Sequence, residues 1–341
     1  MPHHDDTLLA LCRKLIDEQN ITTDPELAAE ILHAAIRLVK DAPGRADSKL
    51  VLRTLKELRY GFKIFRPYQS RRKVSIFGSA RTRAEDPDYK VAADFGRAMA
   101  SAGYMVITGA GGGIMEAGHE GAGQDKSFGV AINLPFEQAT NPVIAGNEKL
   151  AHFRYFFSRK LMLLKETHAV ALFPGGFGTH DEAFEVLTLI STGRTDPLPL
   201  VMLERPGGDY WKKWERFVRE NLLDRGFISP EDMALWHIAS DMNDAVAHIH
   251  KFYGNYHSMR YQKDDVILRI AQPPDAESLA RIAADFADLL RPGGAFHLTG
   301  SEVEPADAPV PQYARLVFPF NRRAPGRLRM LIDRLNQIGK T

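Results

Sequence analysis

The pattern of apolar and polar residues changes near residue 73. Before it, apolar residues recur at helical spacing, and helices are predicted over 6–19, from Pro25 onwards and over 48–60. Asp24 is placed to cap the second helix, with Pro25 at its first position. The apolar residues of that helix mostly repeat at intervals of three and four: Leu27, Ile31, Leu32, Ala35, Ile36, Leu38 and Val39. Residues 1–66 are therefore predicted to be a helical N-terminal region.

From Lys73 onwards, short apolar runs alternate with amphipathic helices, which is typical of an α/β fold. Strands are predicted at 74–80, 104–109, 128–134, 169–173 and 199–203, with a weak one at 237–239. Helices are predicted over 88–102 and 241–252, and others begin near Ile114, Arg154, His180 and Tyr210. The run AVALF lacks alternation, as expected for a central parallel strand covered on both faces. Residues 67–257 are predicted to be a Rossmann-like, doubly wound parallel sheet.

After His257 a second series of elements begins. Strands are predicted at 266–270, 295–300 and 315–320, helices over 275–290 and 325–338, and a proline-rich loop at 305–311. This β-α-β-β-α order predicts a small α+β domain over 258–341. We find no catalytic constellation in it and expect a role in packing, oligomerisation or effector binding.

The composition is that of a soluble globular protein. Of 341 residues, 44% are hydrophobic and 26% charged, and the formal net charge is +1. The basic clusters at 71–73 and 322–323 are short, and we interpret them as solvated faces. We therefore expect neither a nucleic acid nor a membrane as partner.

The only cysteine, Cys12, excludes an internal disulfide, and a lone thiol cannot build a zinc site. The first 18 residues carry acids and lack the apolar core of a signal peptide. No apolar run approaches the roughly 18 residues of a membrane span. These features predict a cytoplasmic protein.

Two glycine-rich stretches carry the candidate chemistry. One reads TGAGGGIMEAG at 108–118 and the other FPGGFGTHDE at 173–182. Each follows a predicted strand and precedes a predicted helix, so both lie at the carboxyl edge of the sheet, where open α/β folds bind ligands. A helix N-terminus offers unpaired N–H groups and a partial positive charge, which favours an anion such as phosphate.

Spacing argues against two common phosphate sites. In GAGGGI the dinucleotide fingerprint fails at its third glycine, which is Ile114, and the next strand ends at Asn133 instead of an acid. No G-x-x-x-x-G-K-[ST] motif occurs. Either glycine stretch alone is equally well explained as a tight structural turn. Together, with acids at the second helix start, they favour a ligand site.

Glu182 is predicted in the first turn of the second helix. As a structural residue it would, with Thr179 and Asp181, only satisfy the helix macrodipole, a contribution of about 0.3–1 kcal/mol each. As a functional residue it would stand beside a bound phosphate, as the reacting centre of a sugar phosphate requires. Arg159 and Lys160 lie in the otherwise apolar segment 153–166, where a cation needs a partner such as Glu182 or a ligand phosphate.

The combination of GAGGGIMEAG, SRK and PGGFGTHDE resembles the Lonely Guy (LOG) family of nucleoside 5′-monophosphate phosphoribohydrolases, often mislabelled lysine decarboxylases. The resemblance covers residues 73–252 and includes FGSA at 77–80, NLPFEQATNP at 133–142 and EVLTLISTGR at 185–194, as in longer bacterial members. It implies hydrolysis of the N-glycosidic bond of an AMP-like nucleotide to free base and ribose 5-phosphate, with no metal or cofactor. It also implies a homodimer or higher homo-oligomer.

Carried over by motif position, Arg159 and Glu182 would be the catalytic pair, and Arg159 would hold Glu182 ionised. The substrate-binding residues would be Ser79, Gly112, Gly113, Met115, Asn133, Lys160, Gly175, Gly176, Gly178 and Thr179. Phe157 stands where family members often have a histidine, which puts any contact from that histidine in doubt. The preferred base, and whether the product is a cytokinin or a recycled base, cannot be derived from the motifs.

Two other functions fit parts of the pattern. A nucleotide-binding regulatory protein would use the same pocket without cleavage. A pyridoxal-phosphate decarboxylase would need Lys160 or Lys165 as its Schiff-base lysine, and no partner for the pyridine ring is evident. His119, His152 and His180 lack metal-ligand spacing and are interpreted as packing or surface residues. His180, between the glycine turn and Glu182, is the exception to be tested.

Overall fold

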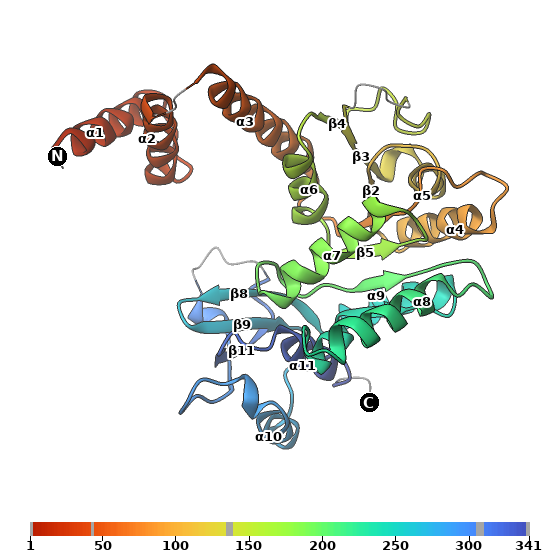
Figure 1. The fold of residues 1–341 in the computed structure, drawn as a ribbon. Coiled ribbons are helices and arrows are strands. Elements are labelled where there is room, and N and C mark those ends of the chain that lie inside the picture. The colour runs from red at the N-terminus through yellow and green to blue at the C-terminus, as the bar shows by residue number, and fades with distance from the viewer. Residues whose placement is uncertain (1–2, 42–43, 134–138, 305–309, 339–341) are drawn as a thin grey trace. The chain divides into compact units, whose positions relative to one another are not determined.

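The computed structural model describes residues 3–41, 44–133, 139–304 and 310–338 (Figure 1). It divides into two compact units, Met1–Tyr60 and Gly61–Thr341. Each unit is described by itself. The division into three domains at residues 66 and 257 remains a prediction.

The first unit is helical, as predicted. It contains α1 (His3–Glu18), α2 (Pro25–Asp41) and most of α3 (Arg45–Phe65), which is longer at both ends than the sequence pattern indicated. The Asp24 Oδ1 atom accepts a hydrogen bond from the Leu27 amide at 3.2 Å, so the predicted N-cap forms. Cys12, Ile16 and Ala29 form the small buried core of the α1–α2 pair.

The second unit contains a seven-stranded parallel sheet in the order β4-β3-β2-β1-β5-β6-β7. The strands are β1 (Lys73–Phe77), β2 (Met105–Thr108), β3 (Ser127–Ile132), β4 (Leu150–Phe153), β5 (Ala169–Leu172), β6 (Leu200–Met202) and β7 (Trp236–Ile238). This confirms the predicted doubly wound α/β class. Strand β4 was not predicted, because its sequence LAHF contains the exposed, polar His152 and lacks the continuous apolar run of the other strands.

Helices alternate with these strands. They are α4 (Pro87–Ser101), α5 (Ile114–Ala122), α6 (Phe156–Lys165), α7 (Phe177–Ser191), α8 (Tyr210–Val218) and α9 (Met242–Phe252). Short 3₁₀-helices lie at Arg66–Tyr68, Gln124–Lys126, Pro230–Leu235, Ala287–Leu289 and Ser301–Val303, and a π-helix at Arg219–Leu223. No helix in the described part of the chain is both long and apolar enough to cross a membrane.

The chain reverses its direction across the sheet between β1 and β5. The order β1 to β4 extends to one side of β1, while β5 to β7 extend to the other. Neighbouring strands whose connections leave in opposite directions open a crevice at their carboxyl ends. The loops after β1 and β5 border that crevice.

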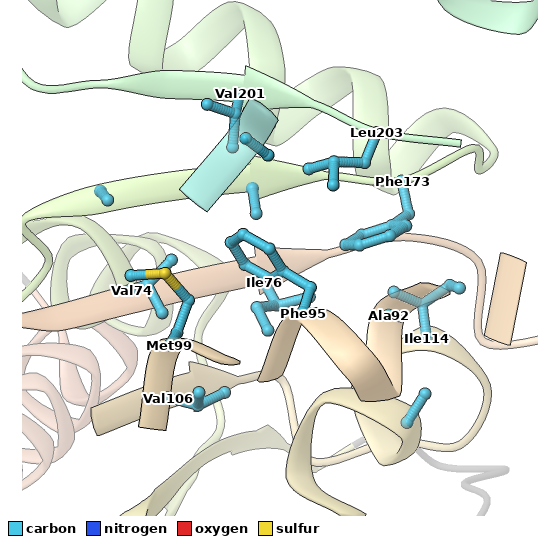
Figure 2. Close-up of a cluster of buried hydrophobic side chains, with 14 of the residues drawn as sticks. Val74, Ile76, Ala92, Phe95, Met99, Val106, Ile114, Phe173, Val201 and Leu203 are labelled. Atoms are coloured by element: carbon cyan, nitrogen blue, oxygen red, sulfur yellow. The ribbon is translucent and has the colours of Figure 1, made fainter. Parts of the chain in front are cut away.

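Alternation along β1 assigns its side chains to two layers. Val74 and Ile76 enter the main hydrophobic core, where α4 contributes Phe95 (Figure 2). Ser75 points to the other face, and its hydroxyl donates to the Leu163 carbonyl of α6 at 2.8 Å. The sheet is thereby covered on both faces, which explains its continuous apolar strands.

Lys73 corrects one sequence interpretation. Its side chain, in the basic cluster read as a solvated face, is only 1% exposed. The ammonium donates to the Tyr68 carbonyl at 2.8 Å and to the Arg71 carbonyl at 3.0 Å. For Lys73 the interpretation as a solvated residue is therefore wrong.

The rest of the unit forms a four-stranded antiparallel sheet in the order β10-β11-β9-β8. Its elements are β8 (Tyr256–Gln262), β9 (Asp265–Ile270), α10 (Ala276–Asp285), β10 (His297–Thr299), β11 (Ala314–Pro319) and α11 (Pro325–Leu335). Strand β8 was not predicted, because it lies where the sequence indicated a domain boundary. Of the predicted loop at 305–311, residues 305–309 lie outside the described residues. Helix α11 also packs against α7 of the larger sheet.

Candidate active site

A cavity of about 840 Å³ lies at the carboxyl ends of β1 and β5. Its walls are residues 77–81 after β1 and 176–182 at the start of α7, with four residues from other elements: Met115, Ile132, Phe156 and Arg159. Its volume is within the range of about 300–1,000 Å³ of small-molecule sites. The predicted catalytic pair, Arg159 and Glu182, lines this one cavity.

Arg159 depends on the first glycine of the 109–113 loop. The Arg159 Nε atom donates to the Val130 carbonyl of β3 at 2.9 Å. A Cβ atom built on Gly109 would lie 2.2 Å from Arg159 Nη2 and 2.8 Å from the sulfur of Met115. Gly109 is therefore needed to admit the arginine, and no phosphate has to be invoked to explain it.

Behind this loop, His119 is part of a buried hydrogen-bond network. Its Nε2 atom lies 3.0 Å from the Phe128 carbonyl, so Nε2 carries the proton and Nδ1 accepts from the Asn141 amide at 3.2 Å. Asn141 also donates to the Gly111 carbonyl at 3.0 Å. Burial lowers the pKa of His119 to about 4, so the ring is neutral. His119 supports the loop from inside, in line with its interpretation as a packing histidine.

In the second loop, neighbouring glycines have different surroundings. A Cβ atom on Gly175 would lie 2.1 Å from the Thr179 hydroxyl oxygen, whereas one on Gly176 or Gly178 would meet nothing within 4 Å. Gly176 and Gly178 line the cavity together with Thr179. The Thr179 and His180 amides donate to the Gly176 carbonyl at 3.1 and 3.2 Å. Because the first amide groups of a helix lack partners one turn back, the start of α7 is a candidate anion site.

Ser79 joins the two glycine loops. Its amide donates to the Pro174 carbonyl at 3.1 Å, and its carbonyl accepts from the Ile114 amide at 3.1 Å. Its hydroxyl accepts from the Arg81 amide at 3.1 Å. Arg81 lines the cavity but was not predicted, although it directly follows the FGSA motif.

The carboxyl group of Glu182 is buried, with the residue only 6% exposed. Its Oε2 atom has no hydrogen-bond partner within the described ranges. Burial raises the pKa of Glu182 to about 7, and the nearby charges of Lys160 and then Arg159 offset this only in part. The sequence predicted a carboxylate held ionised by Arg159. The attraction has the expected sign, but desolvation outweighs it.

Lys160 bridges α6 and α7. Its ammonium lies 2.6 Å from Glu185 Oε2 and 2.8 Å from Asp181 Oδ2. Burial lowers the pKa of Lys160, but hydrogen bonds to these two carboxylates outweigh it, and the net shift is upward. Lys160 is not among the described residues that line the cavity, so its contact with substrate remains a prediction.

The other predicted substrate residues occupy different places. Met115 lines the cavity, while Gly113 packs against the Ser79 carbonyl. Gly112 faces the Ala80 carbonyl and the Glu116 side chain. Exposed Asn133 has its Oδ1 atom 3.2 Å from His152 Nδ1, outside the cavity wall. Residues 134–138 of the NLPFEQATNP stretch lie outside the described residues.

Aromatic side chains at the cavity were not predicted. Phe156 and Phe177 line it, and Phe177 is 97% exposed. Phe157, at the family's histidine position, instead stacks on Tyr155 with ring centroids 5.4 Å apart. Within the described ranges, no group of three or more His, Cys, Asp or Glu side chains is placed to hold a metal ion.

Comparison with known proteins gives a family match over part of the chain. Residues 112–249 match the family model described as possible lysine decarboxylase. This segment contains Arg159, the 175–179 turn and Glu182. A comparison with curated protein sequences gives no significant match.

Several solved structures resemble about half of the chain. The structural-genomics protein TM1055 is 23% identical, with 53% of this chain and 99% of that chain covered and a TM-score of 0.40. The Moco carrier protein from Chlamydomonas reinhardtii is 19% identical, with 53% of this chain and 96% of that chain covered and a TM-score of 0.37. DNA processing protein A from Helicobacter pylori is 15% identical, with 54% of this chain and 82% of that chain covered and a TM-score of 0.37.

Proposed function

We propose that this chain hydrolyses the N-glycosidic bond of a nucleoside 5′-monophosphate. Its residues 112–249 match the possible lysine decarboxylase family, which confirms its resemblance to the Lonely Guy family. One observation carries the proposal. The buried Glu182 carboxyl, with Oε2 lacking a described partner, lies one turn from the amide groups suited to a phosphate. A carboxyl group and an anion site this close match the size of a ribose 5-phosphate.

In this mechanism the phosphate binds at the start of α7, near Gly176, Gly178 and Thr179. Charge-assisted hydrogen bonds of about 1.5–3 kcal/mol each hold it there and orient the ribose. Because the phosphate is remote from the bond that breaks, its binding energy serves to position the reacting carbon. A nucleoside without phosphate should therefore react poorly.

Glu182 would act at C1′ of the ribose. Loss of the base develops oxocarbenium charge on the sugar, which a carboxylate stabilises. Ionised Glu182 takes a proton from the attacking water, the water oxygen bonds to C1′ and the C–N bond breaks. The departing base takes up a proton from solvent, and Glu182 then releases its proton to solvent. A pKa of about 7 suits this proton transfer at neutral pH. Arg159, anchored on Val130, would hold the ribose or phosphate beside Glu182.

The structure weakens the decarboxylase alternative. A Schiff-base lysine needs a lowered pKa, whereas that of Lys160 is raised. Lys165 forms an ion pair with Glu166 at 2.7 Å. A nucleotide-binding regulatory protein would use the same cavity, but it has no need of a buried carboxyl group with a raised pKa.

The test is a panel of nucleoside 5′-monophosphates incubated with the purified protein, with free base and ribose 5-phosphate measured. We expect cleavage of at least one, and a loss of about 10²–10⁴-fold in kcat for Glu182→Gln. Glu185→Gln, the same change one turn further along α7, is the control and should cost far less. If no monophosphate is cleaved, or if Glu182→Gln is as fast as the parent, the proposal fails.

We further propose that the chain acts as a homodimer or higher homo-oligomer. The family resemblance supports this, and so does the apolar surface of α6, where Phe156, Phe157 and Leu161 are exposed. Light scattering on the purified protein tests it. A monomer at micromolar concentration would contradict it.

A further inference from the structure

His180 lines the cavity beside Thr179, and the mechanism above does not use it. Its Nε2 atom lies 2.7 Å from the Tyr210 hydroxyl oxygen. The same hydroxyl lies 2.6 Å from the Gly175 carbonyl oxygen and 3.4 Å from the Gly175 amide. One tyrosine from α8 thus contacts both the histidine and the glycine turn.

The directions of these hydrogen bonds follow from the donors available. A carbonyl oxygen only accepts, so the Tyr210 hydroxyl donates its single proton to Gly175. The contact between Tyr210 and His180 must then be donated by Nε2–H of the histidine. His180 therefore has the Nε2–H tautomer, and burial lowers its pKa and keeps the ring neutral. The chain of donors runs from His180 through Tyr210 to Gly175.

Tyr210 is itself fixed in place. It is the first residue of α8, and its amide donates to Glu204 Oε2 at 3.0 Å. The Trp211 amide donates to the other oxygen of Glu204 at 3.1 Å. The Tyr210 ring stacks on His180, with centroids 5.9 Å apart, and meets Trp211 edge-on at 4.9 Å. The hydroxyl therefore reaches the turn from a rigid support outside it.

Gly175 is the point at which this support matters. A Cβ atom added to Gly175 would lie 2.1 Å from the Thr179 hydroxyl oxygen and 3.0 Å from the Ser79 amide nitrogen, so this glycine is closely packed. Gly176 and Gly178, which follow it, have open space instead. Restraint at Gly175 thus sets the direction in which the open part of the turn presents its amide groups.

We propose that Tyr210 and His180 form a positioning pair that holds the 175–179 turn in its anion-binding conformation and so determines specificity for phosphorylated ligands. This inference rests on the proposed function for the class of ligand, a nucleoside 5′-monophosphate, for which AMP is the probe. It requires only that AMP binds, not that it is cleaved.

The test compares AMP with adenosine in the Glu182→Gln background, where turnover does not interfere. Tyr210→Phe keeps the ring but removes the hydroxyl. We expect calorimetry to show about a tenfold loss of AMP affinity, because a lost hydrogen bond leaves the Gly175 carbonyl unsatisfied. Adenosine affinity should stay unchanged, because adenosine places no charge at the turn.

The matched control is Tyr253→Phe. The Tyr253 hydroxyl also donates to a carbonyl, that of His168, at 2.6 Å, but Tyr253 does not line the cavity. This variant should leave both affinities unchanged. Similar losses for AMP and adenosine in Tyr210→Phe would indicate general damage and overturn the inference, as would no loss at all.

Two further measurements test the pair itself. His180→Phe should cost AMP affinity as Tyr210→Phe does, and the double variant should lose little more, because the two residues act in one chain. Nitrogen-15 NMR of His180 should show the Nε2–H tautomer in the parent and a mixture in Tyr210→Phe. Additive losses, or an unaltered tautomer, would overturn the inference. Absence of binding by every nucleoside 5′-monophosphate of the panel would also overturn it, whereas binding without cleavage would defeat only the proposed hydrolysis.

Discussion

The two glycine loops look alike in sequence but have different physical roles. The 109–113 loop is supported from behind by neutral, buried His119 and makes room for Arg159 at Gly109. The 175–179 turn leaves Gly176 and Gly178 open to the cavity and leads to Glu182. Glycine is needed for packing in the first loop, and in the second we propose that it gives a ligand access. The predictions below test this division.

The largest expected effect concerns Glu182 and pH. Its folded pKa of about 7 exceeds the ordinary 4.5, so the folded state binds the proton more tightly than the unfolded state. Stability from this group is present below pH 4.5 and is lost as the pH rises through about 7. At pH 8, Glu182→Gln should be more stable than the parent by about 3 kcal/mol, with little difference at pH 4.5.

Urea unfolding at both pH values measures this difference. Equal stability of parent and variant at pH 8 would show that Glu182 is solvated and would contradict its raised pKa.

The catalytic rate of the parent should rise with pH through about 7, because the ionised carboxylate acts as the base.

Gly109→Ala should have the next largest effect. The added methyl group would lie 2.2 Å from Arg159 Nη2, so the guanidinium must move. A displacement of about 1 Å can cost about 100-fold in rate, and we expect this loss in kcat. Steady-state kinetics measures it. Gly44→Ala, where an added Cβ atom meets nothing within 4 Å, is the control and should keep the parent rate. Full activity of Gly109→Ala would show that this loop does not position Arg159.

Neighbouring glycines in the second loop should respond differently. Gly175→Ala places a methyl group 2.1 Å from the Thr179 hydroxyl and should lower the free energy of unfolding by about 1–3 kcal/mol. Gly176→Ala meets nothing within 4 Å and should leave stability unchanged, but its methyl group faces the cavity. There we expect KM to rise about tenfold, because the phosphate can no longer approach closely.

Thermal unfolding and steady-state kinetics of these two variants give the comparison. Equal KM values for parent and Gly176→Ala would show that the phosphate binds elsewhere. Loss of stability in Gly176→Ala alone would reverse the roles assigned to the two glycines.

Much of the fold could be predicted because its signals are local. Apolar runs and helix starts gave the order of strands and helices from residue 73 to residue 252, with boundaries shifted by a few residues. Strand β4 was missed because the exposed His152 interrupts its apolar run. Strand β8 was missed for a different reason, since it lies at the expected boundary before residue 258.

The family resemblance also paired Arg159 with Glu182, and both line one cavity in the structure. The sequence could not predict the contribution of Tyr210, which lies 35 residues from Gly175. Nor could it predict that the Lys160 ammonium forms ion pairs with Asp181 and Glu185. Such contacts depend on how α6, α7 and α8 pack, and no local pattern encodes that packing.

The sequence by itself thus determined the α/β class and the two glycine loops, since each depends on residue type and spacing along the chain, and its family resemblance suggested the pair Arg159 and Glu182. Only the tertiary structure decided which glycine faces the cavity, and that burial raises the pKa of Glu182 to about 7. Both depend on the neighbours that folding brings around a group. Desolvation in particular is a property of the whole surroundings of a carboxyl group, not of the residues next to it in the sequence.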